Sequence, residues 1–88
     1  MLIAIDYDGT YTADPRMWEA FIVGTNHLGH EIVICTGRAF PPNHEFAPWV
    51  TVHCTAGQAK RDYLAALGIH PDVWIDDDPQ SILTDDVR

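Results

Sequence analysis

Two aspartates, Asp6 and Asp8, stand one residue apart, directly after the apolar run at 2–5 and directly before Gly9. Carboxylates this close raise each other's pKa unless a cation or hydrogen-bond donors intervene. The pattern is typical of a solvated Asp-Gly turn, and equally of a hard-metal site built from oxygen ligands in which one carboxylate acts as a nucleophile. The aspartates alone leave both interpretations open.

Polar groups follow two further apolar runs in the same way. Thr36-Gly37-Arg38 follows residues 32–35, and Asp76-Asp77-Asp78 follows residues 73–75. Runs of this kind, rich in β-branched residues and without alternation, are typical of strands buried on both faces of a parallel sheet. Each set of polar groups is therefore expected at the carboxyl end of a strand, where open α/β sheets bind their ligands.

Helical patterns connect these strands. Asp14 is expected to cap a helix that begins at Pro15 and carries an apolar stripe up to Gly29. A second helix is expected from about residue 56 to residue 67, capped by Thr55, with Lys60 in its second turn. The stripes are Trp18, Phe21, Ile22, Thr25 and Leu28 in the first helix, and Tyr63, Leu64 and Leu67 in the second.

With a further strand at 50–54, the order of elements predicts a single α/β domain over residues 1–88. Right-handed crossovers favour a minimal Rossmann-like three-layer sandwich with a four-stranded parallel sheet in the order 3-2-1-4. The first and fourth strands then flank the switch point of the sheet. Both acidic clusters are expected in one crevice there.

On these residues the chain resembles the haloacid dehalogenase (HAD) superfamily. The first motif of that family matches Asp6-Tyr7-Asp8-Gly9-Thr10, the second matches Thr36, the third a helical lysine such as Lys60, and the fourth the acids after Ile75. The four motifs occur in the family's order and span nearly the whole chain. The chain departs from the family's pattern in two respects. It has no room for a cap domain, and it lacks a clear fifth strand and an acid four residues beyond the acidic pair.

The resemblance implies a phosphomonoester hydrolase, with Asp6 as the nucleophile that forms an aspartyl-phosphate and Asp8 as the general acid and base. It implies Mg²⁺ as cofactor, held by Asp6, the Asp8 carbonyl and an acid of the fourth motif. Asp77 is preferred as that ligand, and Asp76 then orients the site or pairs with the lysine. Phosphate contacts are expected from Thr36, Gly37, Arg38 and Lys60.

Several alternatives stay open. Arg61 competes with Lys60 for the third motif, because adjacent helical residues face about 100° apart. A catalytically silent HAD-fold module that keeps the metal site is the main rival function. A phosphoaccepting receiver domain ranks last, because there the paired acids precede the lysine, whereas here a pair follows it. Asp78 and the acids of the tail, Asp85 and Asp86, are expected to be solvated.

Composition limits the partners. The formal charge of −8 disfavours non-specific nucleic-acid binding and anionic membranes, and no apolar run reaches the ~20 residues that cross a bilayer. A cytoplasmic location is the default expectation. The uncapped site makes a phosphorylated macromolecule a possible substrate. The irregular segment 39–49 is a candidate flap. Phe46 and Trp49 within it are expected to be exposed, which makes them candidates for a contact in a homo-oligomer.

Overall fold

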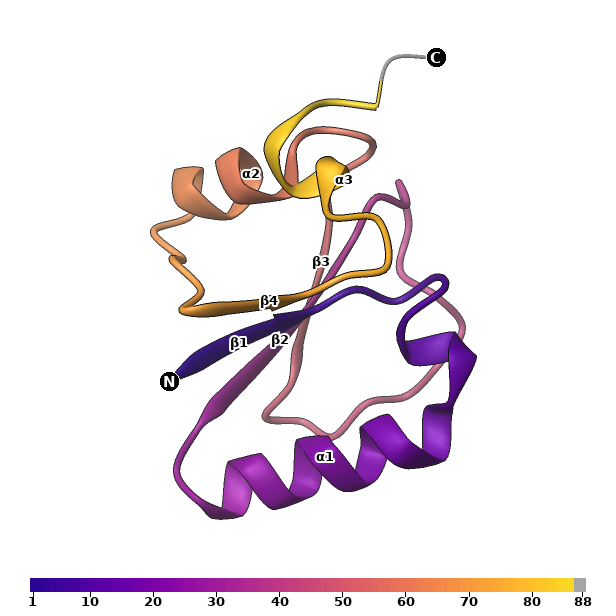
Figure 1. Ribbon diagram of the computed structural model, residues 1–88, viewed down its shortest axis with the longest axis vertical. Helices are drawn as coiled ribbons and strands as arrows, with labels where there is room; N and C mark the ends of the chain where they lie inside the picture. The colour runs from indigo at the N-terminus through magenta and orange to yellow at the C-terminus, as the bar shows by residue number, and fades with distance from the viewer. Residues whose placement is uncertain (87–88) are drawn as a thin grey trace.

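The computed structural model describes residues 1–86 and contains one parallel sheet of four strands (Figure 1). The end of the expected C-terminal tail, residues 87 and 88, lies outside the described part. The strands are β1 (Leu2–Ile5), β2 (Glu31–Thr36), β3 (Thr51–Cys54) and β4 (Val73–Ile75). Their order is β3-β2-β1-β4, and every pairing is parallel, which confirms the predicted topology.

The helices form two layers around this sheet, α1 on one face and α2 and α3 on the other (Figure 1). Their bounds are α1 (Pro15–His27), α2 (Lys60–Ala66) and α3 (Gln80–Leu83), and a short 3₁₀ helix, η1 (Tyr11–Ala13), precedes α1. Trp18, Phe21 and Ile22 of α1 pack on one face of the sheet, and Leu64 of α2 packs on the other. The predicted three-layer sandwich is therefore observed.

The central strands are the most apolar because both of their faces are covered. Ile5 and Ile34 are completely buried, and they lie side by side in the register of β1 and β2. Ile5 also pairs with Ile75 of β4. This register brings Asp6, Thr36 and the acids after Ile75 to the same edge of the sheet.

Helix α1 begins as its sequence predicts. The Asp14 carboxylate accepts a hydrogen bond from the Met17 amide at 3.2 Å, and Pro15 occupies the first turn. The apolar stripe predicted for this helix was wrong at its C-terminal end, because Leu28 lies beyond the last residue of α1 and is 75% exposed.

Helix α2 starts later than predicted. Ala56 and Gly57 both have positive φ angles, +52° and +86°, so the chain turns instead of continuing as a helix, and α2 begins at Lys60. Thr55 consequently caps no helix, and Lys60 lies in the first turn. Leu67 follows the last helical residue and is 56% exposed, so its assignment to the inner stripe was also wrong.

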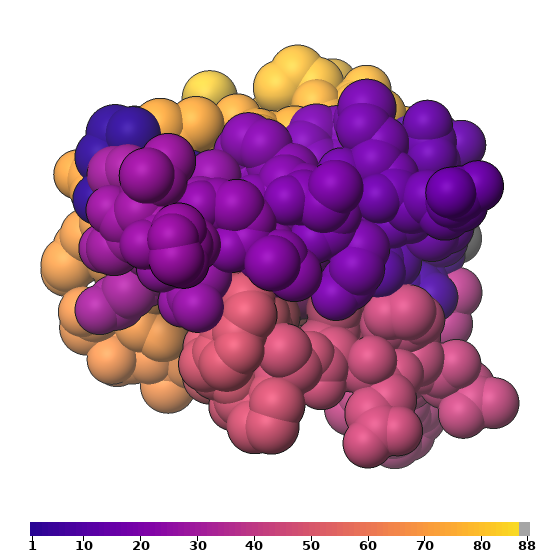
Figure 2. Space-filling view, turned by 90° about the horizontal axis from the view of Figure 1, so that it is seen from below, coloured from indigo at the N-terminus to yellow at the C-terminus, as the bar shows by residue number. Residues whose placement is uncertain are grey.

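The segment 39–49 has neither helix nor strand, as predicted. Phe46 of this segment packs on the core beside Tyr11, with ring centroids 5.0 Å apart, so its predicted exposure was wrong. Seen from below, the residues that lead into β3 lie beside α1 on the surface (Figure 2). Among residues 1–86, no helix has the length and apolarity that crossing a membrane requires.

Candidate functional site

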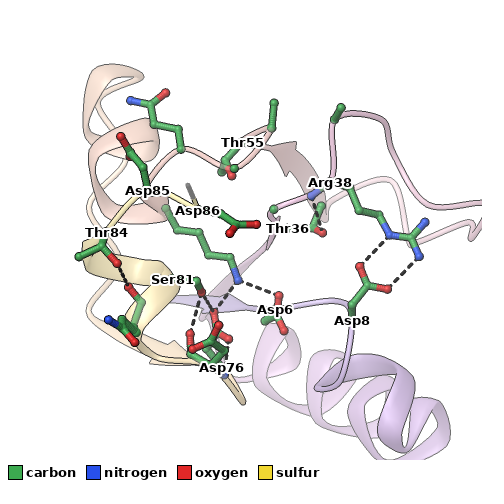
Figure 3. A pocket seen from close by; sticks show the side chains of 18 of the residues that line it. Asp6, Asp8, Thr36, Arg38, Thr55, Asp76, Ser81, Thr84, Asp85 and Asp86 are labelled. Carbon is green, nitrogen blue, oxygen red and sulfur yellow. Dashed lines mark hydrogen bonds and ion pairs between the residues drawn. The ribbon is translucent and has the colours of Figure 1, made fainter. Parts of the chain in front are cut away.

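An open, polar pocket lies at the carboxyl edge of the sheet, where the ends of β1, β2 and β4 meet (Figure 3). Asp6 follows β1, Thr36 ends β2, and Asp76 and Asp77 follow β4. All of the residues predicted for the site line this pocket: Asp6, Asp8, Thr36, Gly37, Arg38, Lys60, Asp76 and Asp77.

Lys60 is a buried cation between two carboxylates. Only 4% of the residue is exposed, and its Nζ lies 2.7 Å from Asp6 Oδ1 and 2.6 Å from Asp76 Oδ2. The start of α2 directs this side chain toward the sheet. The next residue, Arg61, is exposed and lies 3.9 Å from Asp62. The structure therefore brings Lys60 into the site and keeps Arg61 out.

Thr10 connects the two acidic clusters, a role that the sequence did not reveal. Its hydroxyl lies 3.2 Å from both Asp6 Oδ2 and Asp77 Oδ1, and it accepts a hydrogen bond from the Asp77 amide at 3.0 Å. The available signal was its place in Asp-x-Asp-Gly-Thr. Gly9 allows this approach, because its φ is +84° and a Cβ there would collide with the Asp77 carboxylate.

Three carboxylates form a group that fits a hard divalent cation. One oxygen each from Asp6, Asp76 and Asp77 lies within 4.8 Å of the others. Burial raises the pKa of Asp6 to about 6, although Lys60 opposes the change, and hydrogen bonding with Asp77 adds to it. The same hydrogen bond holds the pKa of Asp77 below its usual value. A cation beside Asp6 and Asp77 would relieve this crowding of negative charge.

Asp76 and Asp77 have different surroundings. The Asp76 side chain is 2% exposed and is paired with Lys60, and the Ser81 hydroxyl lies 3.4 Å from Asp76 Oδ2. Asp77 is the exposed member, directed toward Thr10 and Asp6. Asp77 thus has room for a further ligand, whereas one Asp76 oxygen is already bound by an ammonium group.

Asp8 is held by Arg38 in a two-pronged ion pair. Arg38 Nε donates to Asp8 Oδ2 at 2.7 Å, and Nη2 donates to Oδ1 at 2.8 Å (Figure 3). The guanidinium also lies 5.3 Å from the centre of the Tyr7 ring. Hydrogen bonding to Arg38 holds the pKa of Asp8 below its ordinary value. Both side chains are about half exposed, so the ion pair can open to solvent or to a ligand.

Four further residues with chemically active side chains are Asp85, His44, Cys35 and Cys54. Asp85 is exposed, as predicted, and its carboxylate also accepts a hydrogen bond from the Ala59 amide at 2.7 Å. His44 bonds the Tyr11 hydroxyl at 3.0 Å and is not among the residues that line the pocket. Cys35 and Cys54 are free thiols.

The raised pKa of Asp6 predicts how the metal-free protein responds to pH. Its folded pKa is about 6 against 3.8 ordinarily, so its contribution to stability is complete below 3.8 and is lost as the pH rises through about 6. The pKa values of Asp8 and Asp77 are lowered in the folded protein, so these two groups change the stability at lower pH than Asp6 does. Thermal unfolding in a chelator should therefore show a midpoint that falls between about pH 4 and pH 7. Asp6→Asn should lack this fall, and an equal fall in that variant would contradict the assignment to Asp6.

No protein-family model, curated protein or solved structure matches this chain.

Proposed function

We propose that the protein is a magnesium-dependent phosphomonoester hydrolase of the HAD type. The observation that carries the proposal is the meeting of a buried carboxylate, a buried lysine and a second acidic cluster at the ends of β1 and β4. Asp6 lies against Lys60 at 2.7 Å and within reach of Asp77 through Thr10. This combination provides a nucleophile, a positive charge for phosphoryl oxygens and a set of oxygen ligands.

The donor set suits magnesium. Asp6, Asp77 and the carbonyl oxygen of Asp8 would hold the ion, and Asp76 would remain paired with Lys60. Bound Mg²⁺ would supply positive charge that polarises the phosphoryl group and offsets its developing negative charge. Thr36 and Lys60 would bind the phosphoryl oxygens from the other side, as hydrogen-bond donors.

Asp6 would act as the nucleophile. With a pKa near 6 it is mostly ionised at neutral pH, and its oxygen would attack phosphorus while the bond to the leaving alcohol breaks. Asp8 is ionised while Arg38 holds it, so it would first take up a proton from solvent when the ion pair opens. It would give this proton to the alcohol oxygen, and then accept a proton from the water that attacks the aspartyl-phosphate. The products are the alcohol and inorganic phosphate, and both aspartates return to their starting state.

Arg38 connects substrate binding with this chemistry. Asp8 is fully engaged by Arg38, so it can exchange protons with the substrate only after the ion pair opens. The phosphoryl group of a substrate is a competing anion for the guanidinium. Arg38 would therefore move from Asp8 to phosphate as the substrate binds, which reconciles its observed contact with its predicted one.

A catalytically silent binding module is the second candidate, and the same ion pair favours it. If Arg38 stayed on Asp8 when a phosphorylated ligand bound, the site would keep its metal and phosphate contacts without proton transfer. A measurement of catalytic turnover distinguishes the two functions, because only the hydrolase releases phosphate from its ligand.

The test is hydrolysis of p-nitrophenyl phosphate with and without Mg²⁺, for the natural chain and for Asp8→Asn. Nitrophenolate leaves without help from an acid, so Asp8→Asn should still form the aspartyl-phosphate and release about one equivalent of nitrophenol in a burst. Steady turnover should then fall by about 10²-fold or more, because the second step lacks its base.

Asp62→Asn, which removes the same charge from the exposed face of α2, is the matched control and should behave like the natural chain. Magnesium binding without any turnover in the folded natural protein would favour the silent module. Unchanged steady turnover in Asp8→Asn would refute the role of Asp8.

A further inference from the structure

One wall of the pocket carries negative charge that the proposed chemistry does not use. Besides the acids near the metal site, the pocket is lined by Asp78, Asp85 and Asp86. Among residues 1–86, the cations that line it are Arg38 and Lys60, and both are bound to carboxylates of the site described above. Figure 3 shows Asp85 across the pocket from Asp8 and Arg38. We call Thr55, Asp78, Asp85 and Asp86 together the acidic wall.

Hydrogen bonds tie two members of this wall, Asp85 and Asp86, to the loop before α2. The Asp86 amide donates to the Gly57 carbonyl at 2.6 Å, and the Asp85 carboxylate accepts from the Ala59 amide at 2.7 Å. The segment after α3 is therefore tied to the loop 55–59. Asp85 and Asp86 are thus held in the pocket by a loop about 30 residues earlier in the sequence.

Thr55 supplies an independent sign of a ligand. The residue is 4% exposed and lines the pocket, yet its hydroxyl has no hydrogen-bond partner among residues 1–86. Its backbone amide, by contrast, is bonded to the Thr36 carbonyl at 2.9 Å. A buried hydroxyl without a partner destabilises a folded protein, so such groups are normally bonded. A group that enters the pocket would provide the missing bond.

The chemistry of the acidic wall selects that group. Carboxylates only accept hydrogen bonds when ionised, and a threonine hydroxyl can accept one, whereas an ammonium group carries three donors and a positive charge. A leaving group with a second phosphate would be repelled by Asp78 and its acidic neighbours. We propose that the acidic wall is the leaving-group subsite, and that the substrate is a phosphomonoester with an amino group close to the phosphoester. This inference rests on the proposed phosphatase function.

Binding of unreactive analogues in the presence of Mg²⁺ tests the proposal. 3-Aminopropylphosphonate and butylphosphonate have the same shape and differ in one ammonium group. Calorimetry should show about tenfold tighter binding of the amino compound, the size expected for charge-assisted hydrogen bonds at a partly exposed site. Asp78→Asn should reduce this preference, and the matched Asp62→Asn change outside the pocket should leave it intact.

Thr55→Val removes the hydroxyl and keeps the shape of the side chain. We expect it to lower the preference for the amino compound to about threefold and at the same time to raise the melting temperature by about 4 °C, because a buried unpartnered hydroxyl is lost. Thr55→Ser should retain most of the preference. A hydroxyl with a purely structural role would give the opposite result, a lower melting temperature and an unchanged preference.

The ammonium group can belong to a small amino alcohol or to a lysine beside a phosphoserine. A second pair of ligands separates these sources: peptides that carry the phosphonate analogue of phosphoserine, flanked by lysine or by norleucine. Preference for the charged member of either pair supports the proposal and identifies the source. Equal binding within both pairs overturns the acidic wall as a subsite and leaves the phosphatase proposal standing. Absence of binding by every phosphonate overturns both.

Discussion

Replacing Asp6 with asparagine should reduce magnesium-dependent hydrolysis of an aryl phosphate by about 10⁴-fold or more, the loss expected when a covalent nucleophile is removed. The asparagine amide has nearly the same shape as the carboxylate, but its oxygen is too weak a nucleophile to attack phosphorus. The change also removes a negatively charged ligand, so calorimetry should show weaker Mg²⁺ binding. The measurement is the steady rate of nitrophenol release at saturating Mg²⁺.

Folding of this variant is an internal control. Asp6 is 7% exposed and its charge is disfavoured by burial, so asparagine should leave the metal-free protein folded, and more stable than the natural chain above about pH 6. Loss of activity in a folded variant at saturating Mg²⁺ then reports on the site and not on folding. Activity within tenfold of the natural chain would remove Asp6 as the nucleophile. The alternative would then be direct attack of an activated water molecule on phosphorus.

Replacing Lys60 with methionine should lower the free energy of unfolding by about 3 kcal/mol, as expected when one member of a buried ion pair is removed. Methionine fills a similar volume, but the side chains of Asp6 and Asp76, 7% and 2% exposed, lose their shared cation. This loss is large for a domain of 88 residues, whose stability is typically about 5 to 15 kcal/mol. Urea unfolding in a chelator at neutral pH measures it.

Arg61→Met is the matched control, because the neighbouring residue of α2 is exposed and its contact with Asp62 is long, 3.9 Å. It should change stability by less than about 0.5 kcal/mol. The effect of Lys60→Met should shrink as the pH falls, because Lys60 lowers the pKa of Asp6 and without it that carboxyl is protonated at higher pH. Two variants of equal stability would mean that Lys60 does not stabilise the acidic site.

The sequence by itself determined the sheet and the edge at which polar groups gather. Residues 2–5 and 73–75 were placed as strands without error, because their apolar runs are local signals bounded by polar residues. The start of α1 was equally local, since Asp14 and Pro15 favour it through their own geometry. Once the strands and crossovers were known, chain order and handedness left few arrangements other than 3-2-1-4.

Only the tertiary structure decided how the side chains at that edge are paired and which of the remaining alternatives joins them. Thr55 carries the local signal of a helix cap, yet the left-handed turn at Ala56 moves the start of α2 to Lys60. The Thr55 hydroxyl therefore has no hydrogen-bond partner within the described part of the chain. The rotation of α2 then brings Lys60, and not Arg61, to Asp6.

The other decisive contacts join residues far apart in the chain, Arg38 with Asp8 and Asp85 with the Ala59 amide. Propensity and periodicity report the preferences of neighbouring residues. Ion pairs and hydrogen bonds between distant segments depend on how helices and loops pack on the sheet, and no local pattern contains that packing.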